Sequence, residues 1–227
     1  MGILIEGYCV RKISKKSLVA SVLGIVGVAL LVIAVFGLMD YFRTTQSGVD
    51  IPTPETVQSD DVVSEKSVTV TDTGYTVPAD QPRVIEIPSI NAKGYVQKVG
   101  VLSDGVMAAP NNINFAGWYT SSPAPGGEGV SIINGHAGGR YTDGIFRNIN
   151  KLTKDDTVRV QMGDMSWRTF KVVSVNSYDV DEAANPLFKQ DPTIGEALHL
   201  ITCDGVFDDT SQTYDKRVVL VARFVNE

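Results

Sequence analysis

An uninterrupted apolar run near the N-terminus sets the strongest limit on what this chain can fold into. From Leu18 to Met39 about 22 residues are apolar or small, and none is charged. A helix of that length spans the roughly 30 Å hydrocarbon core of a bilayer, whereas a helix in a globular core normally carries a polar stripe. The run therefore predicts a transmembrane anchor over residues 18–39, preceded by a short cytoplasmic segment of residues 1–17.

A cleaved signal peptide is the alternative interpretation of this run. The apolar part of a signal peptide is usually about 7–15 residues long and is followed by a small-x-small cleavage site. The run here is longer and ends in Gly37-Leu38-Met39-Asp40. Its length and its end therefore favour an anchor that is kept.

Basic residues flank the predicted anchor unevenly. Only Arg43 follows it closely, whereas four basic residues precede it: Arg11, Lys12, Lys15 and Lys16. The positive-inside bias then places the N-terminus in the cytoplasm and the rest of this single-pass cell-membrane protein outside the cell. Cys9 and Cys203 would lie on opposite sides of the membrane, which leaves Cys203 as an unpaired thiol in an oxidising compartment. A buried, unreactive cysteine is the alternative.

Residues 40–81 have the composition of a linker. They are rich in Thr, Ser, Asp and Val, and Pro52 and Pro54 interrupt them. Such a segment predicts a flexible stalk with an r.m.s. reach of roughly 35 Å. One short strand is possible within it, over Ser67 to Val70.

Residues 82–227 predict a folded β domain. Short runs rich in Val, Ile and Thr, bounded by Gly, Pro, Asn and Asp, are typical of strands. They lie at 83–87, 95–101, 129–134, 157–162, 167–175, 197–203 and 217–225. Short helices are expected only near 144–149 and 181–188. The pattern favours a closed barrel or a sandwich, and propensity does not choose between them.

Charge and composition exclude several partners and cofactors. The formal net charge is −6, and no basic surface run follows the N-terminal cluster, so nucleic acid is not an expected partner. Two cysteines are too few for a Cys₄ zinc site within one chain. No metal or cofactor is expected. Asp179, Asp181 and Glu182 could ligate calcium, although a solvated acidic loop is the simpler interpretation.

A candidate nucleophile, Cys203, and a candidate base, His136, each lie at the end of a run typical of a buried strand. Cys203 ends the apolar run that begins at Leu198, and a turn signal, Asp204-Gly205, comes directly after it. His136 follows a similar run in a glycine-rich loop. A thiol and an imidazole at strand ends are both held and exposed, which is the placement that cysteine–histidine catalysis needs.

His199 is the competing base, and strand geometry argues against it. On a strand, residues four apart stand roughly 13 Å from each other, whereas a catalytic pair needs near contact. His199 could reach Cys203 only if this segment were helical. We therefore interpret His136 as the base and His199 as a structural residue.

Arg217 begins the last apolar run. If that strand returns antiparallel beside the strand of Cys203, a 13-residue loop from Asp204 to Lys216 brings Arg217 opposite the thiol. A fixed guanidinium there could stabilise an oxyanion or hold the substrate backbone. An ordinary cation at a solvated strand end is an equally good interpretation from spacing alone.

Together these segments resemble the sortase family, over residues 82–227. The resemblance is carried by Gly135-His136 after a buried strand, the strand end Leu200-x-Thr202-Cys203, and Arg217 opening the next strand. The segment from Arg83 to Ile90 resembles the family's first strand. Gly117-Trp118-Tyr119, followed by Pro125-Gly126-x-x-Gly129, is similar to the actinobacterial-type branch called class F.

The resemblance implies a fold, a reaction and partners. It implies an eight-stranded closed β-barrel with short helices, and His136, Cys203 and Arg217 as catalytic residues. It also implies cleavage of a Leu-Pro-x-Thr-Gly-like sorting signal through a Cys thioester, and acyl transfer to an amine of a wall precursor or a pilin lysine. His199 stands where the family's strand has Thr, so altered packing is expected there.

Two other functions fit an anchored, stalked domain. A peptidoglycan L,D-transpeptidase also uses cysteine, but its Ser-His-Gly-x-Cys signature is absent. A non-catalytic surface-binding module would not need an exposed thiol with a matched histidine and arginine. Thiol labelling separates the last alternative, because a binding module should carry a slow, unactivated Cys203.

Overall fold

The computed structural model describes residues 55–58, 63–72, 74–209 and 213–225. The predicted anchor over residues 18–39 and Cys9 lie outside this part of the chain. No helix in the described part is long and apolar enough to cross a membrane. The described residues are mainly β, with one α-helix, α2 (Ala184–Phe188), and two 3₁₀ turns, η1 (Pro88–Ile90) and η2 (Ile149–Lys151).

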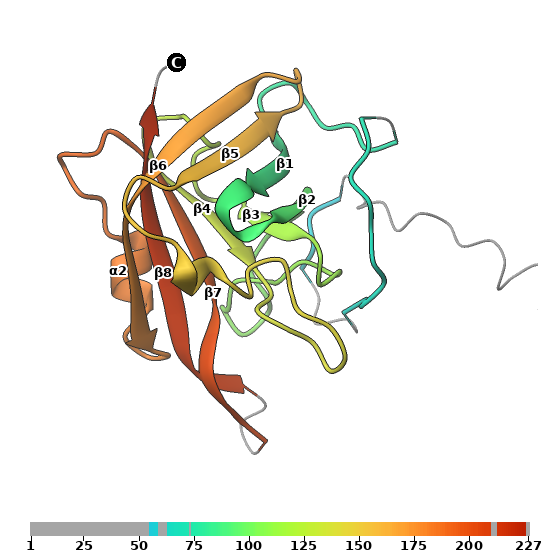
Figure 1. The fold of residues 1–227 in the computed structure, drawn as a ribbon, viewed down its shortest axis with the longest axis vertical. Helices are drawn as coiled ribbons and strands as arrows, with labels where there is room; N and C mark the ends of the chain where they lie inside the picture. The colour runs from blue at the N-terminus through green and yellow to red at the C-terminus, as the bar shows by residue number, and fades with distance from the viewer. Residues whose placement is uncertain (1–54, 59–62, 73, 210–212, 226–227) are drawn as a thin grey trace, which may run out of the picture. The chain divides into compact units, whose positions relative to one another are not determined.

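Eight strands close into a barrel (Figure 1). They are β1 (Pro82–Ile87), β2 (Ala92–Val99), β3 (Ala116–Tyr119), β4 (Gly129–Gly135), β5 (Thr157–Met162), β6 (Trp167–Asp179), β7 (Glu196–Asp208) and β8 (Thr213–Val225). Their order around the barrel is β1-β2-β3-β4-β7-β8-β6-β5. The β2–β3 and β4–β7 pairs are parallel, and the other pairs are antiparallel. The mainly β, eight-stranded closed barrel is thereby confirmed.

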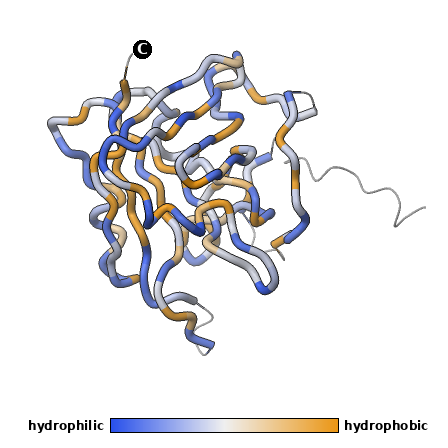
Figure 2. Tube along the Cα trace, in the orientation of Figure 1, coloured by the Kyte–Doolittle hydropathy of each residue, from blue (hydrophilic) through white to orange (hydrophobic). Residues whose placement is uncertain are grey.

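Alternation of side chains along the strands fills the barrel and leaves a second apolar face outside it. Leu198 and Leu200 of β7 pack in the large interior cluster with Leu220 of β8. Ile201 of β7 and Val219 of β8 belong to a separate cluster. Since successive residues of a strand point to opposite faces, this second cluster lies on the outer surface of the barrel. Figure 2 shows hydrophobic and hydrophilic residues alternating along the chain.

The strand pattern predicts seven of the eight barrel strands, and the structure of the barrel domain differs from the rest of the prediction at β3, near 144–149 and between β7 and β8. The short strand β3 is missed, because its sequence, Ala-Gly-Trp-Tyr, shows no run of β-branched residues. A helix near 144–149 is wrong, since turns and the single turn η2 occupy that stretch. The expected 13-residue loop is also wrong, because β7 continues to Asp208 and β8 begins at Thr213.

The described part of the predicted linker packs on the barrel. Tyr75 is 3% exposed and contacts the rings of a cluster that includes Tyr95 and Phe115, with Val68 and Val70 packed against it. The stretch from Ser67 to Val70 belongs to no strand, so the strand prediction there is wrong. The apolar side chains explain the packing, because they cover ring surface that would otherwise face water.

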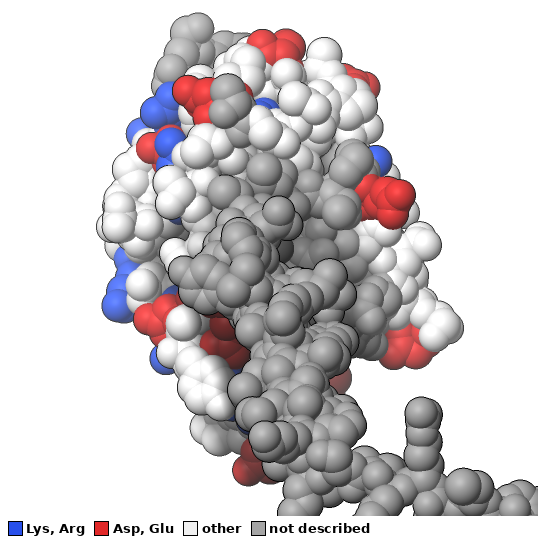
Figure 3. Space-filling view, turned by 90° about the vertical axis from the view of Figure 1, so that its right-hand side faces the viewer, with Lys and Arg blue, Asp and Glu red and all other residues white. Residues whose placement is uncertain are grey.

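Arg83 fastens this segment to the barrel. Its guanidinium is buried and donates to the carbonyls of Thr71 and Tyr75 at 2.7 and 2.9 Å, and to Gln161 Oε1 at 2.8 Å. A buried cation is tolerated when its donors are satisfied in this way. On the face shown in Figure 3, acidic side chains are scattered, and most of the basic ones lie along the left-hand edge.

Candidate active site

Three adjacent strands place the three predicted catalytic residues at one end of the barrel wall. Cys203 on β7 lies directly opposite Arg217 on β8 in the antiparallel register. The parallel pairing of β4 with β7 ends at Asn134 and Ile201, and His136 and Cys203 each lie two residues further on. Thr202 Oγ1 donates to the carbonyl of Gly135 at 2.7 Å, which ties the two strand ends together just before these residues.

Side-chain alternation puts the cysteine and the arginine on the outer face. Ile201 precedes Cys203 by two residues and Val219 follows Arg217 by two, and both belong to the outer apolar cluster. Ile132 of β4 belongs to the same cluster and shares the parity of His136. The site therefore lies on the outer surface of the barrel, in line with an apolar strip.

Burial sets the acidity of Cys203. The side chain is half-buried, and desolvation raises the pKa of its thiol above the ordinary 9.0, while the positive charge of Arg217 lowers it in part. Burial disfavours the thiolate because a charge loses hydration there, and a nearby cation recovers part of that loss.

His136 is held by a backbone carbonyl from the connection between β2 and β3. Its Nε2 lies 2.8 Å from the oxygen of Pro110. A carbonyl oxygen only accepts, so Nε2 carries the hydrogen and Nδ1 is the nitrogen that can exchange a proton. Desolvation lowers the pKa of His136 below 6.5, and the bond to Pro110 opposes that shift.

These two pKa shifts set the resting state of the pair. A thiol with a raised pKa and an imidazole with a lowered pKa are both neutral near pH 7. A thiolate–imidazolium pair of these two residues is then a minor form at neutral pH.

Arg217 is fixed by its own hairpin. Nη1 donates to the carbonyls of Tyr214 and Lys216, each at 2.8 Å, and Nη2 donates to Thr213 Oγ1 at 2.9 Å. A guanidinium has five N–H donors. Within the described part of the chain, its Nε–H and one Nη2 hydrogen have no partner. The arrangement can therefore hold an anion while the guanidinium stays in place.

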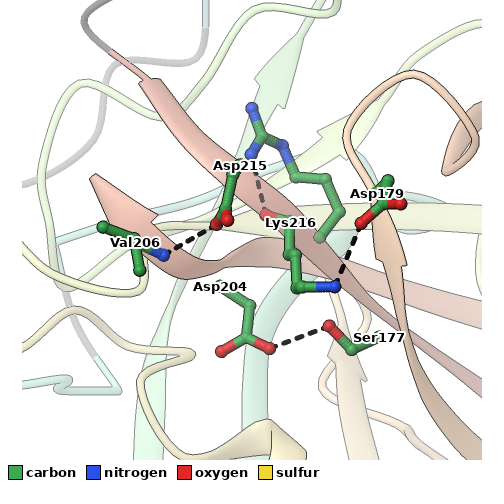
Figure 4. A network of polar contacts seen from close by, with 7 residues as sticks. Ser177, Asp179, Asp204, Val206, Asp215 and Lys216 are labelled. Atoms are coloured by element: carbon green, nitrogen blue, oxygen red, sulfur yellow. Dashed lines mark hydrogen bonds and ion pairs between the residues drawn. The ribbon is translucent and has the colours of Figure 1, made fainter. Parts of the chain in front are cut away.

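Polar contacts also fix the root of the β7–β8 hairpin (Figure 4). Lys216 pairs with Asp179 of β6 at 3.0 Å, and Asp204 accepts from Ser177 at 2.9 Å. Asp215 accepts from the backbone N–H of Val206 at 2.7 Å. Cys203 and Arg217 are adjacent in sequence to Asp204 and Lys216, so these contacts hold both residues in register.

Comparison with protein families assigns the fold. The model of the sortase domain matches residues 85–225. The chain belongs to the sortase family. No curated protein sequence matches it.

Solved sortases resemble the barrel at low sequence identity. Sortase A from Corynebacterium diphtheriae, as a lid mutant, is 21% identical with a TM-score of 0.50, over 64% of this chain and 70% of that one. Sortase C from Clostridium perfringens is 20% identical with a TM-score of 0.45, over 66% and 73% of the two chains. Sortase C from Streptococcus pneumoniae is 17% identical with a TM-score of 0.48, over 65% and 70%.

His199, the competing base in this sortase, is bound elsewhere. It lies on β7, so strand geometry separates it from Cys203 by roughly 13 Å. The residue is 2% exposed, and its Nδ1 lies 2.7 Å from the carbonyl oxygen of Leu187 in α2. Leu187 packs with Ile132 and Val219 in the outer cluster. The histidine thus fastens α2 over the outer apolar face.

The described residues hold no metal-binding arrangement. No group of three or more His, Cys, Asp or Glu side chains among them could hold a metal ion. Asp179, one of the residues considered for calcium, instead pairs with Lys216.

Sequence reasoning missed the residues that hold His136. Pro110 contributes only a carbonyl, which no residue pattern reveals. Asn134 donates from Nδ2 to the carbonyl of Ala108 at 2.7 Å and so holds the same connection. Asn134 lies two residues before His136 on the same face of the strand, and this position was the one sequence feature that could have indicated its role.

Proposed function

We propose that this sortase is a cysteine transpeptidase that cleaves a Leu-Pro-x-Thr-Gly-like sorting signal between Thr and Gly and transfers the acyl group to an amine. The observation that carries the proposal is the register of β7 and β8, which sets Arg217 opposite Cys203, beside the strand end that bears His136. A nucleophile, a proton carrier and an oxyanion donor are the minimum set for acyl transfer from an amide.

The first half of the reaction forms a thioester. Cys203 Sγ, as the thiolate, attacks the Thr carbonyl carbon, and the negative charge moves to the carbonyl oxygen. The free Nε–H and Nη2 hydrogen of Arg217 donate to that oxygen. His136, protonated on both ring nitrogens, gives the Nδ1 proton to the Gly nitrogen as the C–N bond breaks. The Gly-bearing fragment leaves as an amine.

The second half resolves the thioester. The incoming amine attacks the thioester carbonyl while His136 Nδ1 takes its proton, and the C–S bond breaks to release the Cys203 thiolate. The bond from Nε2 to Pro110 persists through both halves, because that nitrogen never gives up its hydrogen. The carbonyl thereby keeps Nδ1 directed at the reacting atoms.

The outer apolar cluster supports recognition of the Leu and Pro side chains. The partly buried residues of this cluster come from β3, β4, β6, β7 and the connection between β2 and β3: Tyr119, Val130, Tyr178, Ile201 and Met107. Phe188 of α2 is 52% exposed and packs edge-on against Tyr119 with ring centroids 6.1 Å apart. Such a surface suits the apolar end of a peptide whose scissile bond lies at the thiol.

Finer assignments are part of the same proposal. The Gly117-Trp118-Tyr119 and Pro125-Gly126 segments support placement near class F. The apolar run over residues 18–39 supports anchoring in the cell membrane with the barrel outside the cell. A wall precursor or a pilin lysine is then the amine acceptor.

The test is product analysis with a panel of sorting-signal peptides and an added amine. We expect cleavage between Thr and Gly, and a new amide between Thr and the added amine. A matched peptide with Thr-Gly reversed serves as the control. Hydrolysis or transfer at another bond, or turnover of cell-wall peptides in place of the panel, would assign a different reaction.

A further inference from the structure

The segment just before the barrel contacts both connections that hold His136. We propose that Glu65 is a positioning residue for His136, so that this segment is part of the active-site architecture. The inference rests on the proposed function for its kinetic consequence. Its structural content is independent, because it concerns only how the loop after His136 is held.

The first contact is made by the Glu65 carboxylate. Oε1 accepts from the backbone N–H of Arg140 at 2.8 Å, and Oε2 accepts from the N–H of Tyr141 at 2.9 Å and from Thr142 Oγ1 at 3.3 Å. These bonds, that from Arg140 first, lower the pKa of the Glu65 carboxyl group. The carboxylate thus binds three consecutive residues of the loop that follows His136.

That loop returns to the backbone of His136. Gly139 N–H donates to the carbonyl of Thr142 at 2.9 Å, Gly144 N–H to that of Ala137 at 3.0 Å, and Phe146 N–H to that of His136 at 3.0 Å. The loop of residues 137–144 is therefore bound at its tip, residues 140–142, by Glu65. At its base it is bound to the backbone of His136. A movement of the tip is transmitted to the base because these bonds link the two arms.

Gly139 shows how closely the carboxylate approaches. A Cβ added at this position would lie 2.7 Å from Glu65 Oε1 and 2.7 Å from Ile113 Cδ1. Real Cβ atoms do not come so near to other heavy atoms. Glycine is thus the residue that lets the loop and the carboxylate meet.

The second contact is made by the neighbouring backbone. Ser64 N–H donates to the carbonyl of Asn111 at 2.8 Å, and Ile113 N–H donates to the carbonyl of Ser64 at 2.9 Å. The Lys66 carbonyl accepts from Asn114 Nδ2 at 2.9 Å. The carbonyl of Pro110, immediately before this stretch, is the one that the His136 ring donates to. Residues 64–66 therefore bind both the loop that follows His136 and the segment that follows Pro110, whose carbonyl accepts from the His136 ring.

Loss of the carboxylate should affect turnover more than substrate binding. The outer apolar cluster, where the peptide is proposed to bind, contains no residue of the 137–144 loop. A displaced imidazole transfers protons less well in both half-reactions, and small misplacements of a catalytic group cost up to about a hundredfold. For Glu65→Ala we expect kcat to fall about tenfold with KM within about twofold. Glu65→Gln, which keeps one accepting oxygen, should fall between this variant and wild type.

The control is Asp164→Ala. The Asp164 carboxylate also caps a turn, accepting from Ser166 N–H at 2.9 Å and from Ser166 Oγ at 2.6 Å, between β5 and β6. Its loss should leave kcat within about twofold of wild type. Equal losses of kcat in the Glu65 and Asp164 variants would overturn the positioning role.

An activity-independent readout accompanies the kinetics. The chain has two histidines, so proton NMR can follow His136 with His199 as the internal reference, in protein without an affinity tag. In Glu65→Ala we expect the Arg140 and Tyr141 amides to exchange at least about tenfold faster. The pKa of His136 should move up toward 6.5 as water reaches a ring that burial now holds lower. An unchanged His136 titration would overturn the proposal, even if wild type turned over none of the peptides and the proposed function had failed.

Discussion

Burial and the charge of Arg217 act in opposite directions on the pKa of Cys203. Burial raises the pKa of the thiol and the Arg217 charge opposes it, while burial lowers the pKa of His136. The same desolvation that makes the ion pair scarce also strengthens every interaction the pair makes with a substrate. For the proposed reaction we therefore expect a modest rate at neutral pH.

The pH profile of kcat/KM should be a broad bell. Below the pKa of His136 both groups are protonated and no thiolate forms. Above the pKa of Cys203 the imidazole is neutral and no acid remains for the leaving amine. We expect an acid limb below pH 6.5 and an alkaline limb above pH 9.0, because the two pKa values move apart. If both limbs fell between pH 6.5 and pH 9.0, the result would contradict the claim that burial moves the two pKa values apart.

The two histidines should separate by function. His136→Ala removes the proton carrier and should lower kcat/KM by about a hundredfold or more. His199→Ala removes a bond to α2, so it should lower the melting temperature and raise KM while leaving much of kcat. Peptide turnover and thermal unfolding of both variants check this, and the reverse order in kcat would assign the base to His199.

Arg217→Lys should be severely impaired although the charge is kept. An ammonium cannot hold the Tyr214 and Lys216 carbonyls and also donate to an oxyanion, since it lacks the rigid fork of the guanidinium. We expect at least about a hundredfold loss of kcat/KM. The matched change is Arg223→Lys, at the exposed far end of β8, which should stay within about twofold. Equal losses would leave the oxyanion without a partner.

At the scale of elements, the β7–β8 hairpin is the part on which the site depends most. Gly205 lies two residues after Cys203, at an irregularity in the pairing between Asp204 and Phe207. Its φ is +82°, and an added Cβ would lie 2.0 Å from Asp215 Oδ1, the atom that holds Val206. The backbone of the hairpin can adopt this positive φ beside Asp215 because residue 205 is glycine.

Gly205→Ala should therefore destabilise the protein by about 2 kcal/mol and lower kcat/KM as Cys203 and Arg217 lose register. Gly195→Ala is the control, because its added Cβ meets nothing within 4 Å, and it should be nearly neutral. Urea unfolding and peptide turnover of both variants give the comparison. A neutral Gly205→Ala would mean that the hairpin root tolerates another geometry.

The strands that could be predicted are those whose apolar residues alternate or run together. Leu198 to Thr202 reads as a buried strand because Leu, Ile and Thr suit that environment, and the antiparallel return to Arg217 follows from the turn at Asp204-Gly205. The length of the hairpin could not be predicted, since Phe207 and Tyr214 pair as rings, 5.2 Å apart, within a stretch that reads as a polar loop. The partners of His136 are backbone groups and distant residues, which local patterns do not encode.

For the whole molecule, the folded unit extends upstream of the first barrel strand. Tyr75 donates to the carbonyl of Val96 at 2.8 Å and packs edge-on against Tyr95, and Ser64 to Lys66 cross the loops around His136. A composition rich in Ser, Thr and Asp reads as a linker because few of its residues are apolar. Four spaced side chains, Val68, Val70, Tyr75 and Val77, nevertheless join an apolar cluster with Tyr95 and Phe115.

The central claim is that Cys203 carries the acyl group. The direct measurement is intact-protein mass spectrometry after mixing with a Leu-Pro-x-Thr-Gly peptide, followed by peptide mapping. We expect wild type to gain the mass of the peptide through Thr, on Cys203, and to lose it when an amine is added. Cys203→Ala should gain nothing while keeping its fold. An adduct on another residue, or transfer activity retained in Cys203→Ala, would contradict the account.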